Sequence, residues 1–340
     1  MRSELLFQTV QTLYKAAKKA KKIPRTLSIE GPPGGGKTSI VHAAADALNI
    51  PYIELHMPTL LVEDFGIPYP EEGGEGKTFS YKLPHWFPYD GKPGTEDGGI
   101  LLFDDRNQAS ADLQKVLANI CQARNLHGVP LAKGWMVIST GNRQKDRAGA
   151  NRVLSHLRNR ETVLNFETHL DDWTSWAITH GVKPEVISFI RFKPNSLHDF
   201  DPQRDQNPTP RSWVEGVSDI IGDVDPIAEI DCVKGAVGEG PAAEFLGFLK
   251  IFRNLPDPDM ILRDPEKSKV PTDPATLYAL AGSLATRADD KNFSNLIKYV
   301  EREPAEFAVL TVTYALRRDR KLADNPAFNK WAMKNQKMLF

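Results

Sequence analysis

The sequence has few cysteines, no long apolar run and almost no net charge. Only two of its 340 residues are cysteines, Cys121 and Cys232, and they form no Cys-x-x-Cys pair. This pattern argues against a zinc site and a disulfide scaffold, and it fits a reducing compartment. No run comes close to the roughly 18 apolar residues of a membrane span, and the first residues lack a signal-peptide core. We therefore expect a soluble, cytoplasmic protein.

Several classes of chemistry lack their sequence signatures. The formal net charge is −1, which does not indicate a strongly basic nucleic-acid binder, although it leaves room for a local basic patch. The eight histidines are scattered and form no His-Glu-x-x-His motif, so metal-hydrolase chemistry has no support. A Gly-x-Ser-x-Gly nucleophile elbow is also missing.

One stretch carries a specific chemical signature. Residues 31–38 read Gly-Pro-Pro-Gly-Gly-Gly-Lys-Thr, which fits the phosphate-binding pattern G-x-x-x-x-G-K-[ST]. An apolar strand is expected before it, at 26–30, and a helix after it, at 39–49. In this context Lys37 would reach the β- and γ-phosphates of a nucleotide, and Thr38 would bind Mg²⁺. The residues expected to bind the nucleotide are Pro33, Gly34, Gly35, Gly36, Lys37, Thr38 and Ser39.

Two later strands end in polar residues. Residues 100–103 form an apolar run that ends at Asp104 and Asp105, which places carboxylates where open α/β sheets bind ligands. We assign Asp104 to the Mg²⁺ shell and Asp105 to the attacking water. The strand expected at 134–140 leads to Asn142, whose amide could hydrogen-bond the γ-phosphate or that water.

The order of elements predicts a parallel sheet with helices on both faces, within residues 1–168. Its remaining elements are a helix at 4–22, a strand at 52–56, a helix at 109–124, a hairpin at 125–133 and a strand at 163–166. The stretch 66–99 is rich in Gly, Pro and aromatic residues. It would either form a hairpin of its own or present a loop to a partner.

The second half, 169–340, is expected to be helical. Helices are predicted to begin near residues 171, 184, 209, 241, 274, 293 and 304, several of them at a proline. Residues 255–272 are rich in proline and charge and are expected to form a link.

This order of motifs resembles that of the AAA+ ATPases, and within them the MoxR group of the dynein-related branch. The resemblance covers about residues 20–225. It implies a P-loop NTPase core followed by a helical lid and a helical C-terminal extension. It places Lys37 and Thr38 in Walker A, 100–105 in Walker B and Asn142 at sensor 1.

The resemblance also implies roles for three arginines. The segment 157–160 is similar to the family's Leu-x-x-Arg, so Arg160, with Arg158 next in line, would be the arginine finger. Arg211, in Thr-Pro-Arg, would be the nucleotide-contacting sensor 2. Residues 106–109 are similar to the Ile-Asn-Arg-Ala that follows Walker B in relatives. One position departs from the pattern, because Asp105 stands where the family usually has Glu, and a misplacement of about 1 Å can cost a hundredfold in rate.

The resemblance implies a Mg²⁺–ATP hydrolase that forms a ring, with a hexamer expected, because an arginine finger is supplied by a neighbouring subunit. It further implies chaperone-like action on protein clients, with a von Willebrand A-like protein as a possible partner. Two alternatives remain. The basic run at 15–22 would suit a nucleic-acid-acting motor, although such a run is more commonly a solvated helix end. Asp105 would suit a nucleotide switch that hydrolyses ATP slowly.

Overall fold

The computed structural model describes residues 1–71, 78–143, 146 and 161–336. The chain divides into two compact units, Met1–Thr168 and His169–Phe340, and each is described here by itself. Among the described residues, no helix is both long and apolar enough to cross a membrane.

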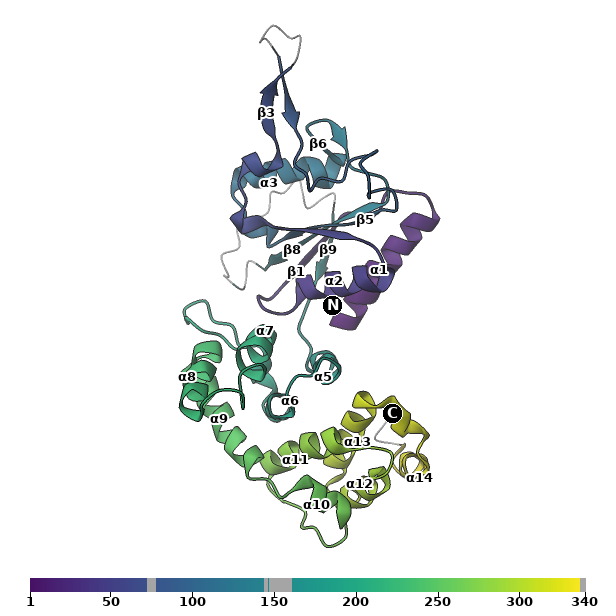
Figure 1. The fold of residues 1–340 in the computed structure, drawn as a ribbon, viewed down its shortest axis with the longest axis vertical. Coiled ribbons are helices and arrows are strands. Elements are labelled where there is room, and N and C mark those ends of the chain that lie inside the picture. The colour runs from purple at the N-terminus through teal and green to yellow at the C-terminus, as the bar shows by residue number, and fades with distance from the viewer. Residues whose placement is uncertain (72–77, 144–145, 147–160, 337–340) are drawn as a thin grey trace. The chain divides into compact units, whose positions relative to one another are not determined.

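A five-stranded sheet forms the centre of the first unit (Figure 1). Its strands are β1 (Leu27–Gly31), β2 (Tyr52–His56), β5 (Gly99–Asp104), β8 (Trp135–Asn142) and β9 (Thr162–Asn165). They pair in parallel in the order β2–β5–β8–β1–β9. The predicted parallel α/β fold is therefore confirmed.

Alternate side chains of β5 enter two different cores. Ile100 and Leu102 pack with buried residues of α1 (Ser3–Lys19) and α2 (Lys37–Leu48). Leu101 and Phe103 pack on the opposite face, with residues of α3 (Ala111–Ala118). Because both faces of the sheet are covered, β5 is a continuous apolar run. It ends at the half-buried Asp104.

The stretch 66–99 contains a hairpin, one of the two arrangements expected for it. The strands β3 (Ile67–Pro70) and β4 (Phe79–Lys82) pair antiparallel and project from the sheet (Figure 1). Ile67 and Phe79 are more than half exposed. The short 3₁₀ turns Met57–Thr59 and Val62–Phe65 lead into this hairpin. A second, smaller hairpin of β6 (Asn125–Leu126) and β7 (Val129–Pro130) lies where one was expected.

The second unit is helical over its described residues, as predicted. Aromatic side chains pack against one another in its core, where Trp213 lies 5.3 Å from Phe189 and 5.6 Å from Phe245, measured between ring centroids. The helices are α5 (Leu170–Thr179), α6 (Pro184–Phe192), α7 (Pro210–Trp213), α8 (Pro226–Val237), α9 (Glu239–Arg253), α10 (Pro258–Arg263), α11 (Pro274–Arg287), α12 (Phe293–Val300), α13 (Ala305–Arg318) and α14 (Pro326–Lys334).

Several predicted boundaries were wrong. The helix expected at 109–124 is regular only in α3 and continues as a π-helical turn at Asn119–Ala123, which ends where Arg124 takes a left-handed backbone conformation with φ of 57°. The helix expected at 4–22 ends at Lys19, since Lys21 has φ of 52°. Leu5 and Leu13 of this helix are exposed, while Leu6, Val10 and Tyr14 are buried.

Three helices of the second unit were missed, namely α8, α10 and α14. The first buries Glu229, whose carboxylate forms an ion pair with Arg253, so its buried face is not a purely apolar stripe. The second is a six-residue helix inside the expected link 255–272. Helices that are short or bury charge give only a weak periodic signal.

Candidate functional site

The predicted phosphate loop joins β1 to α2, as the motif requires. Gly34 and Gly36 have φ of 66° and 92°, a left-handed region that glycine enters without steric cost. The N-terminus of α2 has no side-chain cap. Backbone N–H groups at such an end attract an anion, both as donors and through the helix dipole.

Lys37 lies buried in the hollow of the loop, with 6% of its surface exposed. Its ammonium donates to the carbonyl oxygens of Pro32 at 2.9 Å and Gly31 at 3.3 Å. It also donates to Oδ1 of Asn142 at 3.0 Å. The loop lysine and the Asn at the tip of β8 therefore meet directly, because β1 and β8 are neighbours in the sheet.

Asp104 lies beside Thr38 at the end of β5. The Thr38 hydroxyl donates to Asp104 Oδ1 at 2.5 Å, and the Thr140 hydroxyl donates to the same oxygen. Burial by itself raises the pKa of Asp104, but the hydrogen bonds from Thr140, Thr38 and His56 outweigh it and hold this pKa below its usual value. The ionised carboxylate of Asp104 and the hydroxyl of Thr38 together offer oxygen ligands that suit a hard divalent cation.

Asp105 follows directly and has φ of 50°. Its backbone N–H donates to the Thr140 hydroxyl at 3.1 Å, which ties the residue to β8. Aspartate is one of the few non-glycine residues that tolerate this left-handed conformation.

Asn142 is held in place by Asn107, which lies in the 3₁₀ turn Arg106–Gln108 after Asp105. The Asn107 side chain accepts from the Asn142 N–H at 3.2 Å and donates to the Asn142 carbonyl oxygen. A Cβ on Gly141 would lie 2.8 Å from Asn107 Oδ1, so glycine is needed there for this close approach.

A buried ion pair also anchors the turn Arg106–Gln108. Arg106 pairs with Glu161 and donates to the Ser28 hydroxyl at 3.1 Å. The side chains of Arg106 and Glu161 are 3% and 0% exposed. Losing either partner would leave a buried charge uncompensated.

The structure thus brings together Lys37, Thr38, Asp104, Asp105 and Asn142. The half-buried residues Pro33–Gly36 line the loop, and Ser39 is exposed on the first turn of α2. The arginine-finger candidates Arg158 and Arg160 lie outside the described residues. Arg211 is exposed in α7 of the second unit, where it directly follows Pro210 and the N-cap residue is Thr209.

Three site residues were not assigned from the sequence: His56, Thr140 and Asn107. His56 ends β2, and its Nδ1 lies 3.4 Å from Asp104 Oδ2. Thr140 lies near the end of β8. Both could have been found from their position, because the carboxyl ends of parallel strands share one edge of a sheet.

Residues 27–79 match the family model described as "ATPase family associated with various cellular activities (AAA)". The match covers β1, the phosphate loop, α2, β2 and the start of the β3–β4 hairpin, and it supports a general AAA+ ATPase.

Solved structures with a similar fold include RuvB proteins of Thermotoga maritima. One RuvB point mutant is 14% identical over 91% of this chain and 88% of its own, with a TM-score of 0.43. Another structure, described as the RuvB Holliday junction branch migration motor, is 16% identical over 83% and 81%, with a TM-score of 0.39. No curated protein matches the chain.

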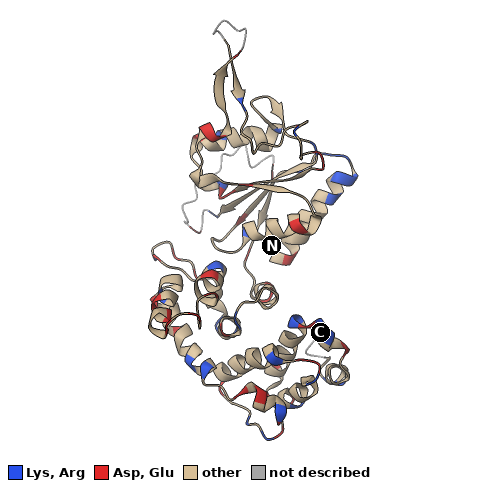
Figure 2. Cartoon of the chain, viewed as in Figure 1, with Lys and Arg blue, Asp and Glu red and all other residues tan. Residues whose placement is uncertain are grey.

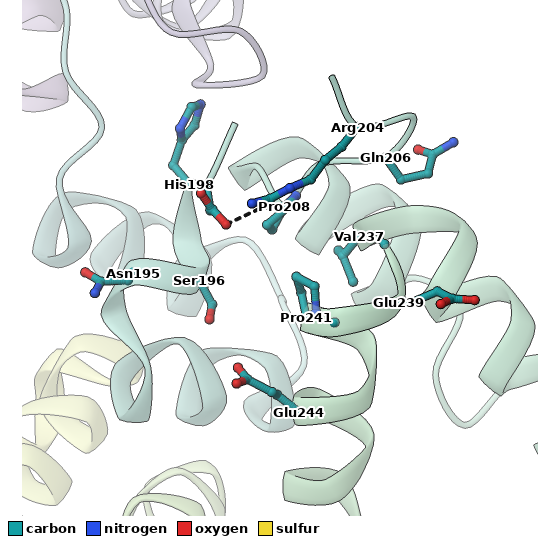
Figure 3. Close-up of a pocket in the computed structure, with 13 residues that line it drawn as sticks. Asn195, Ser196, His198, Arg204, Gln206, Pro208, Val237, Glu239, Pro241 and Glu244 are labelled. Atoms are coloured by element: carbon teal, nitrogen blue, oxygen red, sulfur yellow. Dashed lines mark hydrogen bonds and ion pairs between the residues drawn. The ribbon is translucent and has the colours of Figure 1, made fainter. Parts of the chain in front are cut away.

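The second unit has a cavity of its own, with a volume of about 740 Å³ (Figure 3). Its wall includes Ser196, Glu244 and the loop residue Arg204, which pairs with Asp199 at 2.8 Å. None of the residues assigned to the nucleotide lines it.

The residues present fit a nucleotide and its cation. The loop offers an uncapped helix N-terminus and a buried ammonium, which suits a polyphosphate. Thr38 and Asp104 offer adjacent oxygen ligands for Mg²⁺.

Proposed function

We propose that this chain is a Mg²⁺–ATP hydrolase of the AAA+ class, similar to the MoxR group, which acts as a ring on protein clients. The observation that carries the proposal is the convergence of Lys37 with Asn142 and of Thr38 with Asp104 at one edge of the sheet. A loop that only turned the chain would not need a buried lysine bonded to the neighbouring strand end.

Each residue has a chemical role in this proposal. Lys37 and the loop amides would bind the β- and γ-phosphates, while Thr38 and Asp104 would hold Mg²⁺. The ion would neutralise charge that develops on the phosphates. Asp105 would orient or activate the attacking water, and Asn142 would hydrogen-bond that water or the γ-phosphate.

The assembly is part of the proposal. Arg160, or Arg158, would act as an arginine finger on a neighbouring subunit, in a ring expected to be a hexamer. Residues 1–168 would be the nucleotide-binding domain, and 169–340 the lid and extension, with Arg211 as its contact to nucleotide. A von Willebrand A-like protein would be one partner.

The direct test is the change Lys37→Ala. It should abolish ATP binding measured by calorimetry and ATP hydrolysis measured by phosphate release. Lys115→Ala is the matched control, since Lys115 is an exposed lysine that pairs with Asp112, three residues earlier in α3, and it should behave as wild type. Retained ATP affinity in Lys37→Ala would overturn the site assignment, and wild-type turnover no faster than that of Lys37→Ala would favour the nucleotide switch.

A second candidate is a motor acting on nucleic acid. The C-terminal end of α1 and the residues after it expose Lys15, Lys18, Lys19, Lys21 and Lys22 (Figure 2). DNA binding that weakens steeply with salt and stimulates ATP hydrolysis would favour this candidate. A pull-down with Asp105→Asn, which should hold ATP unhydrolysed, would favour the first if it recovers a protein client.

A further inference from the structure

His56 brings a nitrogen to a site that otherwise offers oxygen. It is the last residue of β2 and the parallel partner of Asp104 on β5. Its Nδ1 lies 3.4 Å from Asp104 Oδ2. One ligand atom from each of His56, Asp104 and Asp105 lies within 4.8 Å of the other two.

The separation between His56 Nδ1 and Asp104 Oδ2 suits a bound metal ion. With bonds of about 2.1 Å, two ligand atoms at right angles are about 3.0 Å apart, and two on opposite sides about 4.2 Å. The distance from His56 to Asp104 falls within this range. The limit of 4.8 Å for all three ligand atoms is longer than this range, so the side chains would move slightly closer together to bind one ion.

Asp104 is already oriented for such a role. Its Oδ1 accepts the hydroxyls of Thr38 and Thr140, which leaves Oδ2 facing His56. The carboxylate therefore cannot rotate without losing these bonds, and its outer oxygen is presented toward the imidazole. The His56 side chain is 50% exposed, so an ion can reach it from solvent.

An imidazole changes which ion is favoured. Mg²⁺ prefers oxygen ligands and water, whereas Mn²⁺, Co²⁺ and Zn²⁺ accept imidazole nitrogen together with carboxylate oxygen. We propose that His56, Asp104 and Asp105 form a mixed nitrogen–oxygen site that binds a first-row transition-metal ion such as Mn²⁺ more tightly than Mg²⁺, even without nucleotide. The inference rests on the proposed function in placing this ion beside the phosphate loop.

The simpler interpretation is that His56 only hydrogen-bonds Asp104. The two interpretations differ in what happens when Mn²⁺ is added to the metal-free, nucleotide-free protein. The full-length chain would be titrated with Mn²⁺, and free ion followed by electron paramagnetic resonance. Pulsed measurements on the bound ion would then detect coupling to a directly bonded nitrogen.

Three variants sharpen this test. His56→Ala should weaken Mn²⁺ binding at least about tenfold, the lower end of what losing a supporting residue costs a metal site, and should remove the nitrogen coupling. His56→Asn serves as a second variant that keeps a polar side chain but removes the imidazole. His42→Ala is the matched control, because His42 contacts the carboxylate of Glu54 and stacks on Tyr52, and it should leave both measurements unchanged.

The expected result is nitrogen-coupled Mn²⁺ in wild type and His42→Ala, no such coupling in either His56 variant, and a Mn²⁺-over-Mg²⁺ preference that falls in both. Absence of Mn²⁺ binding without nucleotide, or nitrogen coupling that survives His56→Ala, would overturn the inference. Neither result would bear on ATP binding through Lys37, which is measured separately, so the inference and the proposed function can fail independently.

Discussion

The backbone of Asp105 gives a physical reason for its side chain. At φ of 50° an ordinary L-residue loses roughly 1–2 kcal/mol, whereas aspartate is among the few that tolerate this region. The sequence shows only that an acid one methylene shorter than usual follows Asp104. The structure adds that the shorter acid suits the left-handed position that its N–H bond to Thr140 maintains.

Two substitutions at this position should therefore separate conformation from chemistry. Asp105→Glu should hold or raise the rate of ATP hydrolysis, because the longer acid reaches further, while lowering the melting temperature slightly. Asp105→Asn should keep the melting temperature, since Asn also tolerates φ above zero, and should abolish hydrolysis. Phosphate release and thermal denaturation check the pair, and a complete loss of turnover in Asp105→Glu would mean that the site is shaped around the shorter acid.

At the scale of elements, the turn after β5 and the end of β8 are joined by one side chain. Asn107 bonds both the N–H and the carbonyl of Asn142. In the proposed function it would therefore be a positioning residue, which would act on hydrolysis through Asn142.

Removing that side chain should affect turnover more than affinity. Asn107→Ala should lower kcat for ATP about tenfold or more, since small misplacements are costly, while nucleotide affinity changes little. Gln108→Ala, in the same turn, should leave kcat close to wild type. Equal losses in kcat and affinity for Asn107→Ala would indicate general damage to the site.

The turn after α12 contains a buried acid, Glu303. Neither carboxylate oxygen has a hydrogen-bond partner among the described residues, and burial raises the pKa of Glu303 to about 8. Between about pH 4.5 and pH 8, the folded state thus keeps a proton on Glu303 that the unfolded chain, with a pKa near 4.5, has released. Stability contributed by the protonated acid is complete below about pH 4.5 and is lost as the pH rises toward 8.

Glu303→Gln should remove this pH dependence. The variant should melt at a higher temperature than wild type at pH 8, and the difference should shrink at pH 5. Thermal denaturation at the two pH values checks this, with Glu301→Gln as a control because Glu301 pairs with Lys334 at the surface. A difference that is the same at both pH values would contradict the buried-acid explanation.

The sequence predicted the elements with strong local signals and missed those that depend on packing. The phosphate loop, the buried strand before Asp104 and the strand leading to Asn142 were predicted because each combines a motif with an apolar run. The contacts of His56, Thr140 and Asn107 were not, because they depend on strand order, and several orders are compatible with the same alternating pattern. The π-helical turn after α3 and the left-handed backbone of Arg124 that ends it were missed, because neither changes the spacing of the apolar residues.

At the scale of the whole molecule, the two units have separate cores, and the residues that converge at the candidate site, Lys37, Thr38, Asp104, Asp105 and Asn142, belong to the first. The proposed finger arginines would complete that site from another copy of the chain. Assembly and hydrolysis would then be coupled, since an isolated chain would lack the positive charge that stabilises the transferred phosphoryl group.

This coupling can be tested by mixing two inactive variants. Arg160→Ala should keep nucleotide affinity and lose about 10³-fold or more in hydrolysis, as expected for an arginine finger. Mixed with Lys37→Ala, it should regain activity, because one variant supplies an intact phosphate loop and the other an intact arginine. If Arg158→Ala shows this behaviour and Arg160→Ala does not, the finger is Arg158. If neither Arg160→Ala nor Arg158→Ala regains activity when mixed with Lys37→Ala, the result would argue against a site shared between subunits.

The hydrogen bonds from Asn107 to Asn142 on β8 have a further consequence for how the site would move. The proposed water-orienting acid, Asp105, is linked in this way to the amide that would sense the γ-phosphate, since only Arg106 separates Asp105 from Asn107, which bonds Asn142. Loss of the γ-phosphate would then move Asp105 and Asn142 together. The signal passed on from the nucleotide site would be this joint displacement of the sheet edge.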